Sequence, residues 1–73
     1  MPVNLITETG RALYGARWYS DMARDLGVDQ RTVRRWASGE FNVPSGVWRE
    51  LAARAWDRSK ELDGLFDKLH KAA

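Results

Sequence analysis

The chain has 73 residues and a mass of 8.4 kDa. At this size folding removes only about 60% of the unfolded chain's surface from water, too little to enclose a deep catalytic cavity, so we expect a binding module and no enzyme. There is no cysteine and one histidine, His70, which excludes disulfides, thiol catalysis and Cys/His zinc sites. The net charge is +2, and the whole excess lies within residues 1–39, where every basic residue is an arginine; this favours an anionic partner.

No apolar run approaches the about 20 residues of a membrane span, and no secretory signal is visible. We therefore expect a cytoplasmic protein that has neither a membrane partner nor a cofactor, and no small-molecule ligand is evident. Helix-forming residues dominate the sequence and nothing alternates with period two, so the predicted fold is all-α.

The first helix is expected over residues 4–14, with Asn4 as its N-cap and Gly15 at its end. Spacing of i, i+4 and i+8 places the following residues on one side of it: Leu5, Ile6, Thr9 and Leu13. Gly10, within this helix, indicates either close packing against another helix or a frayed first turn.

A short second helix is predicted over residues 19–26. Its inward side chains are Met22, Ala23 and Leu26. Gly27 follows and supplies the positive φ that ends a helix.

A third helix is predicted over residues 30–38. Asp29 is a suitable N-cap for it, and Gly39 closes it. Val33 and Trp36, three positions apart, mark its buried side.

A longer helical pattern begins at Pro44 and Ser45. Apolar residues recur in it every seven positions: Trp48, Ala55, Leu62 and Leu69. One continuous helix over residues 45–70 and two helices with a bend near residues 57–59 fit this pattern equally well.

The second and third predicted helices together meet the requirements of a helix-turn-helix. Ala23 is small enough for the two helices to cross there, and Gly27 allows a left-handed turn. Val28, Val33 and Trp36 supply the apolar wedge that holds the pair against the rest of the domain.

The segment YSDMARDLGVDQRTVRRWAS, residues 19–38, resembles the helix-turn-helix of Cro/CI-type (XRE-like) phage and prophage repressors. The flanking LYGARW and GEFNVPSGVW are also similar to short members of that family, so the resemblance covers about residues 5–56. It implies a compact, lambda-repressor-like bundle of four or five helices. It further implies a third helix that enters the DNA major groove, usually in a dimer on a near-palindromic operator. Trp18 departs from the family, which commonly has a Ser or Thr cap before the second helix.

Helical geometry predicts which residues of the third helix face outward. At 100° per residue, the side opposite Val33 and Trp36 holds several polar residues, and Gln30 projects from the helix N-terminus. We expect these DNA base-reading residues: Gln30, Arg31, Arg34, Arg35 and Ser38. A glutamine amide pairs with adenine and an arginine with guanine.

Phosphate contacts are expected from Arg17, Tyr19 and Asn42, which flank the two short helices. Two of these have a competing structural interpretation, because Arg17 has Asp21 as a potential ion-pair partner and Tyr19 could simply cover the core. Arg24 fits better as a structural residue beside neighbouring carboxylates. The four tryptophans are interpreted as core residues rather than a stacking platform for single strands, most firmly at positions 36 and 48.

The C-terminal segment carries a further apolar set: Leu62, Leu65, Phe66 and Leu69. These side chains either fold back as a fifth helix or form a dimer interface, and we favour the dimer. The predicted organisation is a helix-turn-helix domain over residues 1–56, followed by a C-terminal helix over residues 57–73.

The sequence thus predicts a double-stranded-DNA-binding transcriptional regulator, a phage or prophage-type repressor that acts as a homodimer in the bacterial nucleoid. The alternatives are a helix-turn-helix adaptor that binds a protein partner through its last helix, and an architectural phage DNA-binding component.

Overall fold

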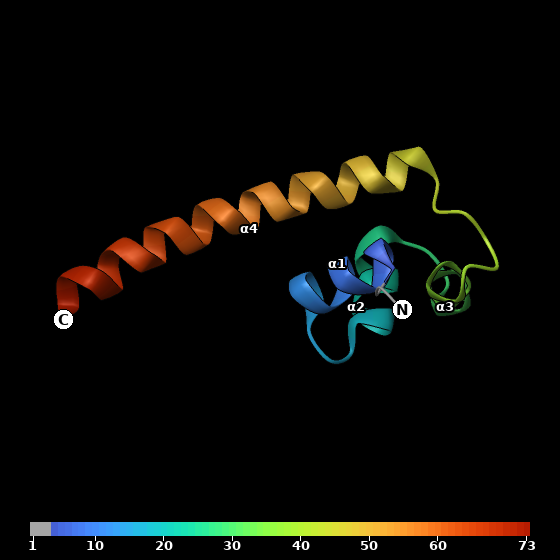
Figure 1. Ribbon diagram of the computed structural model, residues 1–73, viewed down its shortest axis with the longest axis horizontal. Coiled ribbons are helices and arrows are strands. Elements are labelled where there is room, and N and C mark those ends of the chain that lie inside the picture. Colours follow the sequence, from blue (N-terminus) through green and yellow to red (C-terminus); the bar gives the residue numbers. More distant parts are fainter. Residues whose placement is uncertain (1–3) are drawn as a thin grey trace.

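The computed structural model describes residues 4–73, and every regular element in that range is an α-helix. The elements follow in the order α1 (Leu5–Tyr14), α2 (Trp18–Leu26), α3 (Gln30–Ser38) and α4 (Ser45–Ala72). Helices α1 to α3 form a small body, and α4 runs past this body and extends well beyond it (Figure 1). The all-α prediction is confirmed for the described residues, which form four helices and no fifth.

Local capping signals set the ends of the short helices. Asn4 and Asp29 each accept a first-turn backbone N–H, at 3.0 and 2.8 Å, and so cap α1 and α3. The amide of Asn4 also donates to the carbonyl oxygen of Ala37, which ties the start of α1 to α3. Gly27 and Gly39 adopt left-handed conformations, with φ of 71° and 83°, directly after α2 and α3.

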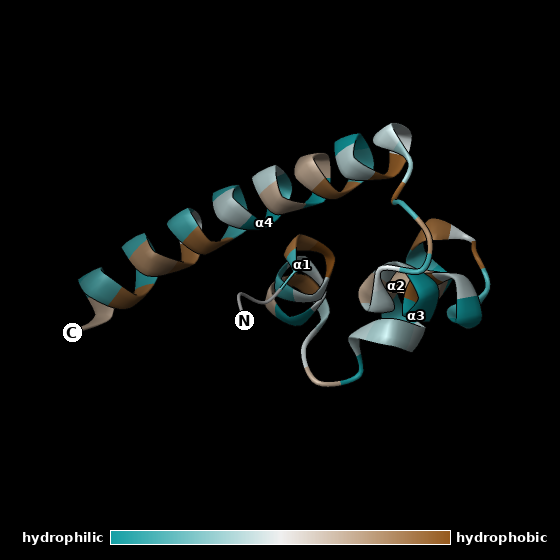
Figure 2. Ribbon diagram, turned by 45° about the vertical axis from the view of Figure 1, so that its right-hand side comes forward, coloured by the Kyte–Doolittle hydropathy of each residue, from teal (hydrophilic) through white to brown (hydrophobic). Residues whose placement is uncertain are grey.

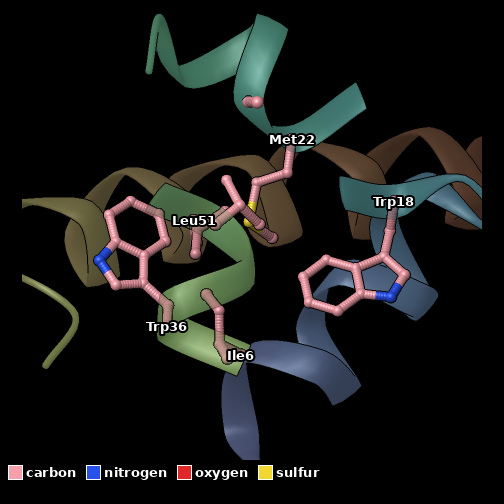
Figure 3. Packing of buried hydrophobic residues seen from close by; sticks show 7 residues of the cluster. Ile6, Trp18, Met22, Trp36 and Leu51 are labelled. Carbon is pink, nitrogen blue, oxygen red and sulfur yellow. The ribbon is translucent and has the colours of Figure 1, made fainter. Parts of the chain in front are cut away.

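The core lies where the four helices meet. Its buried side chains are Ile6, Trp18, Met22, Ala23, Val33, Trp36 and Leu51, and Figure 3 shows the larger ones converging. A Cβ added at Gly10 would collide with the indole of Trp18. Of the two explanations for Gly10, close packing is therefore the one found, and α2 begins one residue earlier than predicted because Trp18 is part of it.

Two apolar side chains lie elsewhere than predicted. Leu5 was expected on the inner side of α1 but is 60% exposed. It lies in the first turn of α1, near Ala52 and Ala55 of α4, and these small side chains do not cover it. Trp56 is 63% exposed, so its interpretation as a core residue is wrong, whereas Trp48 is half-buried against the core.

Helix α4 is continuous over its 28 residues, so of the two arrangements that fit the sequence the unbroken helix is the one found. Its first half packs on the body through Leu51, and Arg58 donates to the carbonyl oxygen of Leu13 at 2.9 Å. Every residue from 55 to 73 is exposed, and hydrophobic bands recur along this part in Figure 2. The fold-back as a fifth helix is therefore not found. No helix within residues 4–73 has the length and apolarity to cross a membrane.

Candidate nucleic-acid interface

The outer face of α3 carries most of the residues predicted to read DNA bases. Val33 and Trp36 are buried at 0 and 5% exposure and fix the rotation of the helix. Arg31, Arg34 and Arg35 are all exposed on the opposite side. The structure therefore brings three guanidinium groups onto one solvent-facing helix surface, as the 100° geometry predicts.

The three arginines differ in what they contact. Among the described residues no ion pair involves Arg31, and the Arg34 guanidinium lies 5.7 Å from the ring centroid of Tyr19. Arg35 lies 3.9 Å from a carboxylate oxygen of Glu40 and 5.1 Å from the ring centroid of Phe41. Arg35 is thus drawn toward the turn after α3. The guanidinium groups of Arg31 and Arg34 are more available than that of Arg35 to contact a bound partner.

The two ends of α3 present different groups. Gln30 is half-buried in the first turn and lines a shallow depression with Asp29, Arg31 and Arg34. Ser38 is exposed at the other end, where its hydroxyl donates to the carbonyl oxygen of Arg35 at 3.1 Å and accepts from a backbone N–H at 3.4 Å. The Ser38 hydroxyl therefore helps to close the helix, a role beyond the base contact predicted for it.

The predicted phosphate-contacting residues lie around the start of α2 and after α3. Arg17 is exposed at the N-cap position of α2, where none of the described side chains caps the helix, so first-turn N–H groups remain open to an acceptor. Tyr19 is half-buried and stacks on Trp18, with ring centroids 4.2 Å apart; through Arg34 it joins the start of α2 to α3. Asn42 is exposed in the loop that leads to α4.

The two carboxylates of α2, Asp21 and Asp25, are both engaged by other side chains. Asp21 pairs with Arg24 at 3.6 Å, which supports the structural interpretation of Arg24 and leaves Arg17 without that partner. Asp25 accepts hydrogen bonds from the Tyr14 hydroxyl at 2.6 Å and from Arg54 Nε at 2.5 Å.

The cluster of Tyr14, Asp25 and Arg54 joins α1, α2 and α4, and its contacts shift the pKa of the tyrosine and of the aspartate. Burial and the hydrogen bond to Asp25 raise the pKa of Tyr14 to about 12. The hydrogen bonds from Tyr14 and Arg54 hold the pKa of Asp25 below its ordinary value of 3.8. No signal in the sequence marks this cluster, because its three residues lie far apart in the chain and share no motif.

The side chains predicted to form a dimer interface all lie on the exposed half of α4. Leu62, Leu65, Phe66 and Leu69 are 53, 48, 65 and 60% exposed. Exposed leucine and phenylalanine in a contiguous row are typical of an interaction surface.

Comparisons with known proteins give no further guide. No protein-family model, curated protein or solved structure is significantly similar to this chain. Within residues 4–73, no three His, Asp or Glu side chains are grouped to hold a metal ion. The function must therefore be argued from the geometry of the exposed faces.

Proposed function

We propose that the chain is a sequence-specific, double-stranded-DNA-binding transcriptional regulator in which α2 and α3 act as a helix-turn-helix. The observation that carries this proposal is the exposure of Arg31 and Arg34 on the face of α3 opposite its buried side. The three-residue connection after α2, with Gly27 left-handed and Ala23 buried between the helices, fits such a unit. The resemblance of residues 19–38 to Cro/CI-type repressors supports the same assignment.

In this proposal α3 lies in the major groove and presents its first turn to the base edges. Gln30 pairs with adenine, and Arg31 and Arg34 pair with guanine, each contact contributing about 1–3 kcal/mol of discrimination. Arg35 and Ser38, which are engaged at the end of α3, contribute to readout less than these three.

Phosphate contacts hold the protein in register on the duplex. Arg17 supplies a charge beside the uncapped N-terminus of α2, and Tyr19 holds Arg34 while its hydroxyl reaches the backbone. Asn42 supplies a contact from the loop on the far side of α3. A homodimer joined through α4 places two such units on a near-palindromic operator and represses by covering a promoter.

The test compares the Arg31→Ala and Arg34→Ala variants with Arg24→Ala, which removes an exposed arginine of α2 outside the proposed interface. Binding sites are selected from a random duplex library, and affinities for the selected duplex are measured by fluorescence anisotropy. We expect Arg31→Ala and Arg34→Ala each to weaken specific binding by about 5- to 150-fold with unchanged circular dichroism, and Arg24→Ala to change it little. Retention of the sequence preference by both variants contradicts the proposal.

The exposed half of α4 favours a second candidate, an adaptor that binds a protein partner through Leu65 and Phe66. A salt titration separates the two functions, because DNA binding through phosphate contacts falls steeply as salt rises. Absence of DNA binding even at low salt supports the adaptor. An architectural role on DNA differs from the regulator by binding without a preferred sequence.

A further inference from the structure

The second half of α4 presents an apolar row that no residue between 4 and 73 covers. Leu62, Phe66 and Leu69 are more than half exposed and follow one another at spacings of four and three residues, which places them on one side of the helix. Because α4 is unbroken over Ser45–Ala72, this row cannot fold back onto the body. A Cβ added at Gly64 would meet open space, and glycine weakens the helix at this point, so a molecule that covers the row also stabilises the helix.

A matching surface lies on the same side of α4, next to the body. An open groove runs between α1 and the first half of α4, lined by Leu5, Thr9, Trp48, Leu51, Ala52 and Ala55. Trp48 and Phe66 are eighteen positions apart, which is five full turns, so the groove and the row share one face of the helix. The alanines leave room for larger side chains, and the exposed Leu5 forms one wall.

We propose that a second copy of this chain covers both surfaces, with the two α4 helices antiparallel and crossing near Ser59. Each C-terminal half then lies in the α1–α4 groove of the other copy. In this register the partner's Leu62 meets Ala55, the partner's Phe66 meets Ala52, and the partner's Leu69 meets Trp48. In the first two pairs a large side chain meets an alanine, and in the third two large side chains stack at the end of the groove. The two-fold symmetry closes the assembly at two copies.

Charges beside this face favour the antiparallel direction. Arg49 and Asp67 are exposed and eighteen positions apart, so they share one flank of α4 at nearly equal distances from Ser59. The antiparallel crossing brings Arg49 near the partner's Asp67, twice by symmetry, whereas in parallel helices positions 49 and 67 stay about 27 Å apart along the axis and form no such pair.

This inference rests on the homodimer of the proposed function and specifies its geometry, but it does not depend on DNA. The chain has no cysteine, so single cysteines report the arrangement directly. Ala52→Cys and Phe66→Cys proteins are mixed without DNA, oxidised and separated under denaturing conditions. The antiparallel register brings positions 52 and 66 of the two copies together but keeps the two copies of position 66 about 21 Å apart along the axis, beyond the reach of a disulfide.

We expect the mixed disulfide to exceed either self-linked product by about tenfold. Self-linked Phe66→Cys protein in excess indicates parallel helices and overturns the proposal. Sedimentation of the unmodified chain as a monomer at high concentration also overturns it. A mixed disulfide in a chain that binds no DNA overturns the regulator and leaves this interface standing.

A charge exchange tests the same register without cysteine. Arg49→Asp alone and Asp67→Arg alone are each expected to raise the dissociation constant of the dimer about tenfold, because two ion pairs become two like-charge contacts. The double variant restores opposite charges and is expected to return within about threefold of the original value. Additive weakening in the double variant contradicts the antiparallel pairing.

Discussion

Two leucines of α4, Leu51 and Leu65, lie fourteen positions apart on similar sides of one helix, yet they have different surroundings. Leu51 is 2% exposed and belongs to the core cluster, whereas Leu65 is 48% exposed and outside that cluster within residues 4–73. The same apolar repeat therefore belongs to a core in one half of α4 and to a free surface in the other. Periodicity tells which side of a helix is apolar, and the rest of the chain decides what covers that side.

The body is held by more than apolar burial. Asn4 bridges α1 to α3, and Arg54 joins α4 to Asp25 on α2, so each helix of the body is anchored at a polar contact as well as in the core. The part of α4 after Arg58 has neither kind of anchor. We therefore expect the same type of substitution to change the free energy of unfolding much more in the body than in the part of α4 after Arg58.

The largest expected difference is between Met22→Ala in the body and Leu65→Ala in the exposed half. Met22 is fully buried, so its truncation leaves a cavity and lowers the free energy of unfolding by about 2–5 kcal/mol. Leu65→Ala changes it by less than about 0.5 kcal/mol in dilute, monomeric protein. Urea denaturation followed by circular dichroism measures both, and equal losses would show that the two regions do not differ in packing.

Replacing either of two helical glycines with alanine is expected to change stability by a smaller amount, and in opposite directions at the two positions. Gly10→Ala forces a methyl group into the indole of Trp18 and is expected to lower the free energy of unfolding by about 1–3 kcal/mol. Gly64→Ala meets open space and is expected to raise helix stability by up to about 1 kcal/mol. Thermal melts of the matched pair check this, and a stabilising Gly10→Ala would contradict the close approach of α1 to α2.

Much of the fold could be predicted because its signals are local. Asn4, Gly27, Asp29 and Gly39 act within a few residues of themselves, so the ends of α1, α2 and α3 follow from the sequence nearly to the residue. The outward direction of Arg31 and its neighbours follows in the same way from the buried Val33 and Trp36. These predictions needed no knowledge of how the helices pack.

The features that sequence reasoning missed depend on contacts between distant segments. Leu5 is part of a regular apolar pattern, and only the small residues opposite it in α4 leave it exposed. Arg35 shares a face with Arg31, but Glu40 and Phe41 draw its guanidinium toward the following turn. Neither outcome can be seen in a single helix.

The smallest expected effect concerns the ion pair that joins the body to α4. The pKa of Asp25 is lowered in the folded chain, so its contribution to stability is complete above the ordinary value of 3.8 and is lost as the pH falls through the lowered value. The pKa of Tyr14 is raised to about 12, so its contribution is complete below its ordinary value of 10 and is lost as the pH rises through 12.

Asp25→Asn is therefore expected to lower the free energy of unfolding by less than about 1 kcal/mol at neutral pH, since this carboxylate is partly exposed to solvent. The difference in free energy of unfolding between this variant and the original chain is expected to shrink as the solution becomes acidic. Tyr14→Phe is the matched control, because it should remove the alkaline loss while leaving the Arg54 contact in place. Denaturation curves between pH 2 and 12 measure both. If Asp25→Asn lost as much stability on acidification as the original chain, Asp25 would not couple α4 to the body. The anchored half of α4 would then depend on Leu51 and its apolar neighbours alone.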